Sequence, residues 1–263
     1  MILDRFRLTG RVAIVTGAGR GIGRGIAIGF AEAGADVVCA ARTESEIEST
    51  AAEVRARGRR GLAVQADVMV TADLARLVGT TLGEFARLDV LVNNAGGTMP
   101  RAALDTDERY FEEALRFNVT SAFLLTRLAA PKMVETAGGG TVVNISSRAS
   151  DMVMPSFVAY GTAKAALNMM TRNIAAELAP KVRVNAISVG GVATDALAVV
   201  LTSDELREQF ERNTPMGRPG TVEDIAACAL YLASPASAWV TGKVFQVDGG
   251  TEAPALTIPV QKL

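Results

Sequence analysis

The sequence predicts an α/β protein: a single doubly wound domain in which a parallel sheet of about seven strands carries helices on both faces. Short runs of Val, Ile, Leu and Ala alternate along the chain with longer stretches of helical periodicity. Parallel strands need a crossover of a dozen or more residues, and these helices supply it. Of the 263 residues, 49% are hydrophobic and only 5% aromatic, so we expect the aliphatic core that suits helices packed on such a sheet.

Each element can be placed in order along the chain. We expect strands where apolar, often β-branched residues cluster, at 12–16, 36–41, 61–66, 90–93, 141–146, 183–187 and 244–247. Helical periodicity continues from the glycine-rich segment after the first strand to about Ala33, and recurs near 44–57, 72–86, 107–135, 156–179 and 222–233. No Pro- or Ser-rich linker divides these elements, so residues 1–263 are expected to form one domain.

Two segments fall outside this alternation. Residues 195–219 contain no strand but include an amphipathic piece at 204–212, so they form either a lid over an active site or a surface insertion. Their length favours the lid. The tail, residues 251–263, combines apolar residues with two prolines. It is either frayed or docked on a neighbouring subunit, and we favour docking.

The absence of histidine excludes several kinds of enzyme. A Ser-His-Asp hydrolase and any His-ligated zinc or haem site are ruled out. Two cysteines, Cys39 and Cys228, cannot build a Cys₄ site, so no metal is expected. The acid or base of any reaction must therefore come from Asp, Glu, Tyr, Lys or Cys.

Charge and hydropathy limit the kinds of partner that the protein can have. Lys and Arg number 27 against 28 Asp and Glu, with no basic block, so nucleic acid is not an expected partner. No apolar run approaches the roughly 18 residues that span a bilayer, and residues 1–11 are too charged for an export signal. We therefore expect no membrane association and a cytoplasmic location, which two unpaired thiols also fit.

A glycine-rich segment follows the first strand and opens a helix. It reads Gly17-x-x-x-Gly21-Ile22-Gly23, which differs from the strict Gly-x-Gly-x-x-Gly pattern. The physical requirement is similar, because the backbone must approach a pyrophosphate closely and a helix N-terminus must face the anion. A plain strand-to-helix turn is the alternative. The strand before the segment and the helix after it favour a Rossmann-type dinucleotide site.

The end of the second expected strand indicates which dinucleotide binds. An acidic residue there would take the ribose hydroxyls of NAD, but this chain reads Ala41-Arg42. Arg42 and Arg20 could instead pair with the 2′-phosphate of NADP. NADP(H) is therefore favoured over NAD(H), the alternative being two solvated arginines.

Candidate acid-base residues lie in the second half of the chain. Tyr160 and Lys164 are four residues apart in an expected helix, so both side chains share one face. A cationic neighbour stabilises a phenolate, and we expect it to bring the pKa of Tyr160 towards neutrality. Ser147 comes just after an expected strand, at the sheet edge where such folds bind ligands. Asn94 follows another strand at the same edge.

Together these motifs closely resemble the short-chain dehydrogenase/reductase family, from about Leu8 to Gly250. The resemblance implies that Tyr160 is the general acid/base, that Lys164 lowers its pKa and binds the nicotinamide ribose, that Ser147 hydrogen-bonds the substrate carbonyl, and that Asn118 holds a water of a proton relay. It also implies a homotetramer, with helices 107–135 and 156–179 and the last strand at the interfaces. The loop and the resemblance together predict coenzyme contacts at Gly17, Gly19, Arg20, Gly21, Ile22, Gly23, Arg42, Asp67, Val68, Asn94, Ala95, Gly96, Tyr160, Lys164, Val192 and Thr194.

One position departs from the family pattern. Where members usually have Pro-Gly after the sixth strand, this chain reads Ser188-Val189-Gly190-Gly191. Val189 lacks the fixed φ of proline, and the glycine pair adds freedom, so we expect a looser loop on the nicotinamide side.

Within the family, the later segments look most similar to bacterial 7α-hydroxysteroid dehydrogenases, and the 3-oxoacyl-carrier-protein reductases are the second choice. Both readings make the chain an oxidoreductase acting on a ketone or secondary alcohol. A non-catalytic nucleotide-binding scaffold is the alternative of another class, but it has no use for the four catalytic-type residues together. The expected walls of the substrate site are apolar or Met-rich, which favours an apolar small molecule, the alternative being that many of these residues belong to ordinary core or lid packing: Met99, Met152, Val153, Met154, Phe157, Leu197, Val199, Val200 and Leu201.

Overall fold

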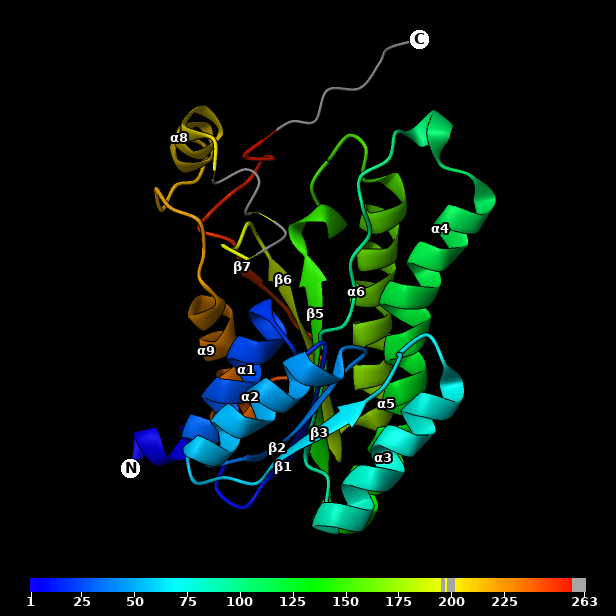
Figure 1. Cartoon of the computed structure of the whole chain (residues 1–263), viewed down its shortest axis with the longest axis vertical. Helices are drawn as coiled ribbons and strands as arrows, with labels where there is room; N and C mark the ends of the chain where they lie inside the picture. Colours follow the sequence, from blue (N-terminus) through cyan, green and yellow to red (C-terminus); the bar gives the residue numbers. More distant parts are fainter. Residues whose placement is uncertain (195–196, 198–201, 257–263) are drawn as a thin grey trace.

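The computed structural model, which describes residues 1–194, 197 and 202–256, contains a seven-stranded parallel sheet with helices on both faces (Figure 1). Its strands are β1 (Val12–Thr16), β2 (Asp36–Ala41), β3 (Gly61–Gln65), β4 (Val90–Asn93), β5 (Gly140–Ser147), β6 (Val182–Val189) and β7 (Val244–Val247). Its helices are α1 (Gly21–Glu32), α2 (Glu44–Ala56), α3 (Thr71–Phe85), α4 (Glu108–Leu115), α5 (Ser121–Ala137), α6 (Val158–Leu178), α8 (Asp204–Arg212) and α9 (Val222–Ala233). The predicted fold class is confirmed.

The strand order places a crevice at the centre of the sheet. The order is β3-β2-β1-β4-β5-β6-β7, so the winding direction changes between β1 and β4. In doubly wound sheets, ligands bind outside the carboxyl ends of the strands at such a point. The ends of β1 and β4 carry Thr16 and Asn93, which lead directly into the glycine-rich and asparagine motifs.

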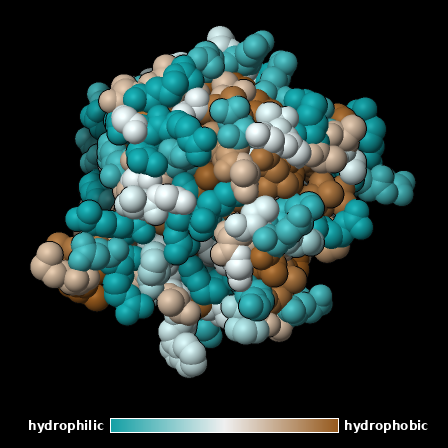
Figure 2. All heavy atoms as spheres, turned by 90° about the horizontal axis from the view of Figure 1, so that it is seen from below, coloured by the Kyte–Doolittle hydropathy of each residue, from teal (hydrophilic) through white to brown (hydrophobic). Residues whose placement is uncertain are grey.

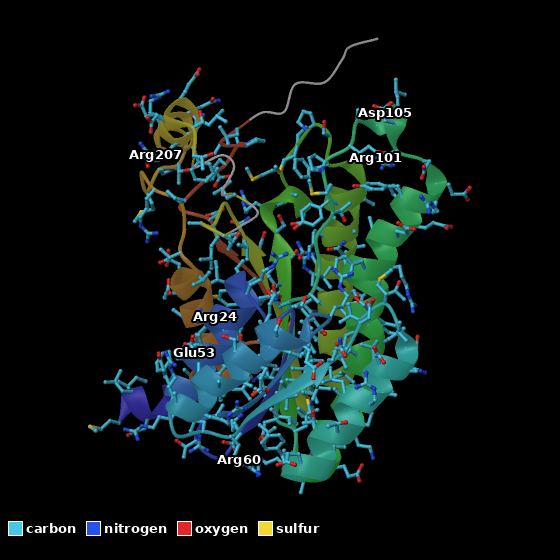
Figure 3. All side chains as sticks on the ribbon, in the orientation of Figure 1. Arg24, Glu53, Arg60, Arg101, Asp105 and Arg207 are labelled. Atoms are coloured by element: carbon cyan, nitrogen blue, oxygen red, sulfur yellow. The ribbon has the colours of Figure 1, made fainter. Side chains whose placement is uncertain are left out.

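The central strands are buried on both faces, and their alternation separates two aliphatic cores. In β1, Ala13 and Val15 pack with α1, α2 and α9, while Val12 and Ile14 pack with α3, α5 and α6. The two helix layers lie on opposite sides of the sheet in Figure 1. Arg24 of α1 forms an ion pair with Glu53 of α2 across the surface of the first layer (Figure 3).

The expected helix at 107–135 is divided in the structure. A π-helical segment, Arg116–Thr120, separates α4 from α5. The 3.6-residue periodicity continues through this segment, so hydropathy alone could not reveal it. The consequence is local, because the wider turn carries Asn118.

Two strands, β5 and β6, are longer than predicted. β6 continues to Val189, two residues beyond the expected end, and pairs there with Ser147 of β5 and Val247 of β7. A valine has the backbone N–H that a strand residue can donate and that proline lacks. Val189 therefore extends the sheet towards the site.

The segment 195–219 and the tail are described in part. Within residues 195–219, α8 forms as expected and buries Phe210, while residues 195–196 and 198–201 lie outside the described part. In the tail, Thr251 and Ala255 are buried, and Asn213 Nδ2 donates a hydrogen bond to the Ala255 carbonyl at 2.9 Å. Residues 251–256 thus pack on their own chain, and 257–263 lie outside the described part. No helix among the described residues is long and apolar enough to cross a membrane.

Asp224 offers a test of what holds α9 in place. The Arg218 guanidinium, 2.7 Å away, and the Thr221 N–H hold the pKa of Asp224 at about 2. This carboxylate contributes stability above its unfolded pKa of about 3.9 and loses it as the pH falls through the folded value. We expect Asp224→Asn to lower the free energy of unfolding at pH 7 by about 0.5–1 kcal/mol.

Urea denaturation at pH 7 and at pH 2.5 measures this difference. The loss should be full at pH 7 and smaller at pH 2.5, where the wild-type carboxylate is partly protonated. An equal loss at both pH values would contradict the assignment. Asp204→Asn, at the exposed first turn of α8, is the matched control and should change stability little at either pH.

Candidate active site

The glycine-rich loop is shaped by backbone contacts that exclude side chains. Gly17 and Gly21 have φ values of +63° and +54°, in the left-handed region that favours glycine. A Cβ on Gly23 would overlap the Gly17 carbonyl, and one on Gly17 would lie 2.7 Å from Asn94 Nδ2. The free N–H groups at the start of α1 thus stay accessible to an anion. This cradle fits the pyrophosphate of a dinucleotide.

Thr16 joins the two strands that flank the crevice. Its Oγ1 donates to the Val92 carbonyl at 3.2 Å and accepts from the backbone N–H groups of Asn94 and Ala95 at 3.0 and 3.1 Å. Asn94 Nδ2 donates to the carbonyls of Thr16 and Gly17 at 2.9 and 3.2 Å. The asparagine motif therefore fixes the glycine loop. Thr16 was not predicted as a site residue, although its place at a strand end before Gly17 could have signalled it.

A cavity of about 240 Å³ lies beside this junction, at the carboxyl ends of β1, β2 and β4. It brings together nine of the predicted coenzyme contacts: Gly17, Gly19, Arg20, Arg42, Asp67, Val68, Asn94, Ala95 and Gly96. Five further residues line it that sequence reasoning missed: Ala41, Thr43, Glu46, Ala66 and Phe117. Glu46 comes from the first turn of α2 and lies against Gly19, where a Cβ would be 2.8 Å from its Oε2. The sequence could not indicate this carboxylate, because it enters the cavity only through the packing of α2 against the glycine-rich loop.

The remaining predicted contacts surround the loop from the other side. Thr194 Cγ2 would lie 3.5 Å from a Cβ on Gly21, so the segment after β6 meets the start of α1. Val192 is buried and forms a bridge with Gly220. Ile22 and Gly23 lie in the first turn of α1, on the side that packs into the core, and so hold the glycine-rich loop against the sheet.

The loop after β6 is held more firmly than expected from its glycines. Gly190 N–H donates to the Val247 carbonyl at 3.0 Å, and Gly220 N–H donates to the Gly191 carbonyl at 2.9 Å. A Cβ on Gly191 would overlap the ring of Phe210 in α8. The glycine pair therefore makes room for close packing, and these bonds oppose the freedom that we expected.

Four predicted catalytic residues converge from three elements. Ser147 ends β5, Tyr160 and Lys164 lie one turn apart on α6, and Asn118 is buried in the π-helical segment. A Cβ on Gly96 would lie 2.8 Å from Asn118 Oδ1 and 3.1 Å from Lys164 Nζ, so only glycine fits between them. Ser147 hydrogen-bonds to Tyr160.

Asn118 and Lys164 also fix the backbone around them. Asn118 Oδ1 accepts from the Gly97 N–H at 2.8 Å, and its Nδ2 donates to the Ala114 carbonyl at 2.9 Å. Lys164 Nζ donates to the Ile145 carbonyl of β5 at 2.8 Å. These bonds tie the π-helical turn to α4 and to the segment after β4, and they tie α6 to β5.

The pKa values differ from the expectation. Burial raises the pKa of Tyr160, and the hydrogen bond from Ser147 lowers it by less. Burial also lowers the pKa of Lys164 to about 8, and its Nζ lies 5.7 Å from the centre of the Tyr160 ring. Our expectation that Lys164 brings Tyr160 towards neutrality was therefore wrong for the protein's own groups. The ammonium is turned to the Ile145 carbonyl, and desolvation disfavours both charged forms.

A buried polar network lies directly beneath these residues. Asn93 Nδ2 donates to Asn144 Oδ1 at 2.9 Å and to Thr126 Oγ1 at 3.1 Å. Asn144 Nδ2 donates to Thr171 Oγ1 at 2.9 Å. These bonds join β4 and β5 to α5 and α6. Sequence reasoning did not find this network, because single Asn and Thr residues in apolar segments give no signal of their partners.

The expected substrate walls are only partly placed. Met152, Val153, Met154 and Phe157 lie in the loop between β5 and α6, and the Phe157 ring is tilted against the Tyr160 ring with 6.1 Å between the ring centres. Arg101 N–H donates to the Ser156 carbonyl at 2.7 Å and ties this loop to the segment after Met99. Leu197 N–H bonds the Thr194 carbonyl. Val199, Val200 and Leu201 lie outside the described residues.

The arrangement defines a class of protein. A cavity bordered by the glycine loop opens beside a Ser-Tyr-Lys group that can exchange a proton, as reduction of a carbonyl or oxidation of an alcohol requires. Within residues 1–194, 197 and 202–256, no group of three or more Asp, Glu or Cys side chains could hold a metal ion. Fold and site therefore describe a nicotinamide-dependent oxidoreductase.

Comparison with known proteins supplies the family. Residues 17–252 match the family model described as enoyl-(acyl carrier protein) reductase. An uncharacterized oxidoreductase of Mycobacterium tuberculosis is 50% identical over 263 residues, the whole of both chains. The 7α-hydroxysteroid dehydrogenase of Escherichia coli K12 is 39% identical over 248 residues, which cover 94% of this chain and 96% of the relative. A 3-oxoacyl-[acyl-carrier-protein] reductase of Synechocystis is 38% identical over 246 residues, 92% of this chain and 97% of the relative.

Solved structures agree with these relatives. A 7α-hydroxysteroid dehydrogenase complexed with NADH and 7-oxo glycochenodeoxycholic acid matches with a TM-score of 0.91 and 38% identity, covering 95% of this chain and 97% of that one. A short-chain type dehydrogenase/reductase from Mycobacterium marinum matches with a TM-score of 0.90 and 35% identity, covering 97% and 100%. The chain belongs to the short-chain dehydrogenase/reductase family and is an oxidoreductase of the kind that binds a nicotinamide coenzyme.

The state of Lys164 can be tested without substrate. Because burial lowers its pKa to about 8, we expect its ε-methylene signal to titrate near pH 8 in the coenzyme-free protein. Two-dimensional NMR of protein labelled with ¹³C at lysine Cε measures this. The signal should be missing from Lys164→Met, which assigns it. A Lys164 signal that titrates near 10.4, as for a solvated lysine, would refute the desolvation of this side chain.

Proposed function

We propose that the protein transfers a hydride between NADP(H) and an apolar ketone or secondary alcohol. The observation that carries this proposal is the convergence of Ser147, Tyr160, Lys164 and Asn118 around Gly96, beside the cradle of the glycine loop. A protein that only bound a nucleotide would need the cradle and not the proton-exchanging group.

The chain's own residues have distinct tasks in this proposal. Tyr160 donates a proton to the substrate oxygen during reduction, and its raised pKa keeps it protonated at neutral pH. Ser147, which hydrogen-bonds Tyr160, also donates a hydrogen bond to that oxygen. When bound, the nicotinamide coenzyme supplies or accepts the hydride.

Two further residues assist Tyr160 in this proposal, Lys164 and Asn118. Lys164 holds its charge at neutral pH, because its pKa of about 8 lies above 7, and it can bind the hydroxyls of a ribose. Asn118 Nδ2 donates to the carbonyls of Gly97 and Ala114 and to Thr98 Oγ1, and the one bond that its Oδ1 accepts from the described residues comes from the Gly97 N–H. The oxygen therefore has a lone pair for a water of a proton relay.

NADP(H) is the proposed coenzyme. Arg20 and Arg42 line the adenosine end of the cavity, and the Arg42 carbonyl accepts from Gln65 Nε2 at 2.8 Å, which steadies the end of β2. Glu46 is a carboxylate in the same cavity and opposes a 2′-phosphate. Two guanidinium groups outweigh this one charge.

The substrate is proposed to be apolar, as for the hydroxysteroid dehydrogenases that this chain resembles. Met99 and Val153 are strongly exposed on the two segments that Arg101 and Ser156 join, so the entrance to the site is apolar. An acyl-thioester on a carrier protein is the second candidate, supported by the relative of that activity. A carrier protein needs a basic docking surface, and residues 134–140 hold no cation.

A homotetramer in the cytoplasm completes the proposal. Phe123 of α5 and Met169 of α6 are exposed apolar side chains, and Trp239 is fully exposed in the segment before β7. Viewed from below, apolar atoms also gather on the side of the molecule that carries α5 and α6 (Figure 2). Burial of these groups between subunits would remove apolar area from water.

The chemistry is tested with Tyr160→Phe. We expect turnover to fall by about 10²–10⁴-fold, because only the proton donor is removed, while NADPH affinity stays within about twofold. The assay is NADPH oxidation at 340 nm with steroid ketones, acyl thioesters and keto sugars. Tyr231→Phe, in α9, is the matched control and should keep wild-type turnover.

The same panel identifies the substrate class. The highest kcat/KM is expected with steroid ketones. A preference for acyl thioesters would favour a 3-oxoacyl-carrier-protein reductase over a hydroxysteroid dehydrogenase-like enzyme. If no carbonyl is turned over although NADPH binds tightly, a non-catalytic nucleotide-binding scaffold is favoured.

The coenzyme preference is tested with Arg42→Asp. We expect the wild type to bind NADPH about 10- to 100-fold more tightly than NADH, the difference that charge-assisted hydrogen bonds provide. Arg42→Asp should reverse the order, because the carboxylate repels the 2′-phosphate and accepts from ribose hydroxyls. Coenzyme fluorescence titration measures both affinities. Arg109→Asp, exposed on α4, is the control; equal wild-type affinities would refute the NADP(H) assignment.

A further inference from the structure

Arg148 is a buried cation directly beside the proposed catalytic serine. Only 7% of its side chain is exposed, and it opens the short turn that follows Ser147. In this turn, the Ala149 N–H donates to Ser147 Oγ at 3.2 Å. The orientation of the serine hydroxyl therefore depends on the conformation of the turn that Arg148 anchors.

The guanidinium contacts two separate parts of the chain. Nη1 lies 2.6 Å from Asp151 Oδ2 in the loop between β5 and α6. Nε lies 2.7 Å from Asp248 Oδ2, an ion pair whose angle is outside the hydrogen-bond range. Nη2 donates to the Thr251 carbonyl at 3.0 Å and lies 3.6 Å from Glu252 Oε2. The charge is thus matched by carboxylates on both sides.

The loop between β5 and α6 is held by the same cluster. Asp151 also accepts from Gln246 Nε2 of β7 at 2.9 Å. The loop carries Met152, Val153 and Phe157, which are expected substrate walls. One guanidinium therefore joins Ser147 to the loop that forms the entrance of the site.

The C-terminal segment 248–256 connects this cluster to the residues that follow α8. The Met216 N–H donates to the Gly249 carbonyl at 3.1 Å, and Asn213 Nδ2 donates to the Ala255 carbonyl. Both donors lie just after α8. A Cβ on Gly190 would lie 2.6 Å from Asp248 Cα, so the loop after β6 rests on the same segment.

We propose that Arg148 is a positioning residue that makes Ser147, the β5–α6 loop and the segment 248–256 one rigid unit around the active site. The planar fork of arginine reaches its partners simultaneously, which the single ammonium of lysine cannot do. The part of this inference that concerns turnover rests on the proposed function, whereas the coupling of the three segments does not.

The test compares Arg148→Met, Arg148→Lys and a matched control. Arg87→Met removes an arginine that is bonded to the buried Asp89 just before β4, at the amino ends of the strands and so on the far side of the sheet from the site. Hydrogen-deuterium exchange is measured on the full protein with bound NADPH. Steady-state kinetics use the ketone of the panel with the highest kcat/KM.

With Arg148→Met we expect faster exchange in residues 148–157 and 248–256 together, a kcat that is about 10- to 100-fold lower, and a raised KM. Arg148→Lys keeps the positive charge, but we expect it to restore neither the wild-type exchange rates nor the wild-type kcat and KM. Arg87→Met should lower thermal stability and leave exchange in both segments, kcat and KM unchanged.

Wild-type exchange in the segment 248–256 of Arg148→Met, or full rescue by Arg148→Lys, would overturn the proposal. If Arg148→Met does not fold, Gln246→Leu loosens only the Asp151 contact and must increase exchange in 148–157; no increase would overturn it equally. If no ketone is turned over by the wild type, the proposed function fails while the exchange result still decides the coupling.

Discussion

The buried hydrogen bonds of Asn93 and Asn144 hold together the four elements on which the site depends. An amide in an apolar sheet is tolerated only when its donors and acceptor are matched, and here Thr126 and Thr171 supply partners. Because each bond crosses between elements, α5 and α6 cannot shift along the sheet without leaving a buried polar group unpaired. The relative positions of Ser147, Tyr160, Lys164 and Asn118 follow from this constraint.

Close approaches at glycine complete the geometry above that network. Gly96 lets Asn118 Oδ1 and Lys164 Nζ come together, and Gly23 lets the glycine loop fold onto the start of α1. At Gly191, the missing side chain is replaced by the ring of Phe210 from α8. At these three positions the absence of a side chain allows other groups to pack closely against the backbone. The loop after β6 is also tied to β7 through the backbone N–H of Gly190. The same principle joins the crevice, the acid-base group and α8 into one site.

The electrostatics depend on burial more than on the spacing of the charges. Tyr160 and Lys164 share a helix face, yet desolvation raises the pKa of the phenol and lowers that of the amine. At neutral pH this leaves a protonated tyrosine beside a charged lysine, which is the state needed to donate a proton to a carbonyl oxygen. Arg148, by contrast, lies in the interior beside carboxylates from two segments, Asp151 in one and Asp248 and Glu252 in the other.

The sequence by itself determined where the strands lie along the chain, the glycine loop, the Tyr-x-x-x-Lys pair and the serine at a strand end, because each is a local pattern with a fixed period or spacing. It also predicted nine residues that line one cavity, since strand ends of a parallel sheet meet at one edge. Only the tertiary structure decided that Thr16 joins two strands, that Glu46 enters the coenzyme cavity, that a π-helical turn carries Asn118, and that Arg148 links Ser147 to the C-terminal segment. These features arise from contacts between residues far apart in the chain and from burial, and neither leaves a periodic trace in the sequence.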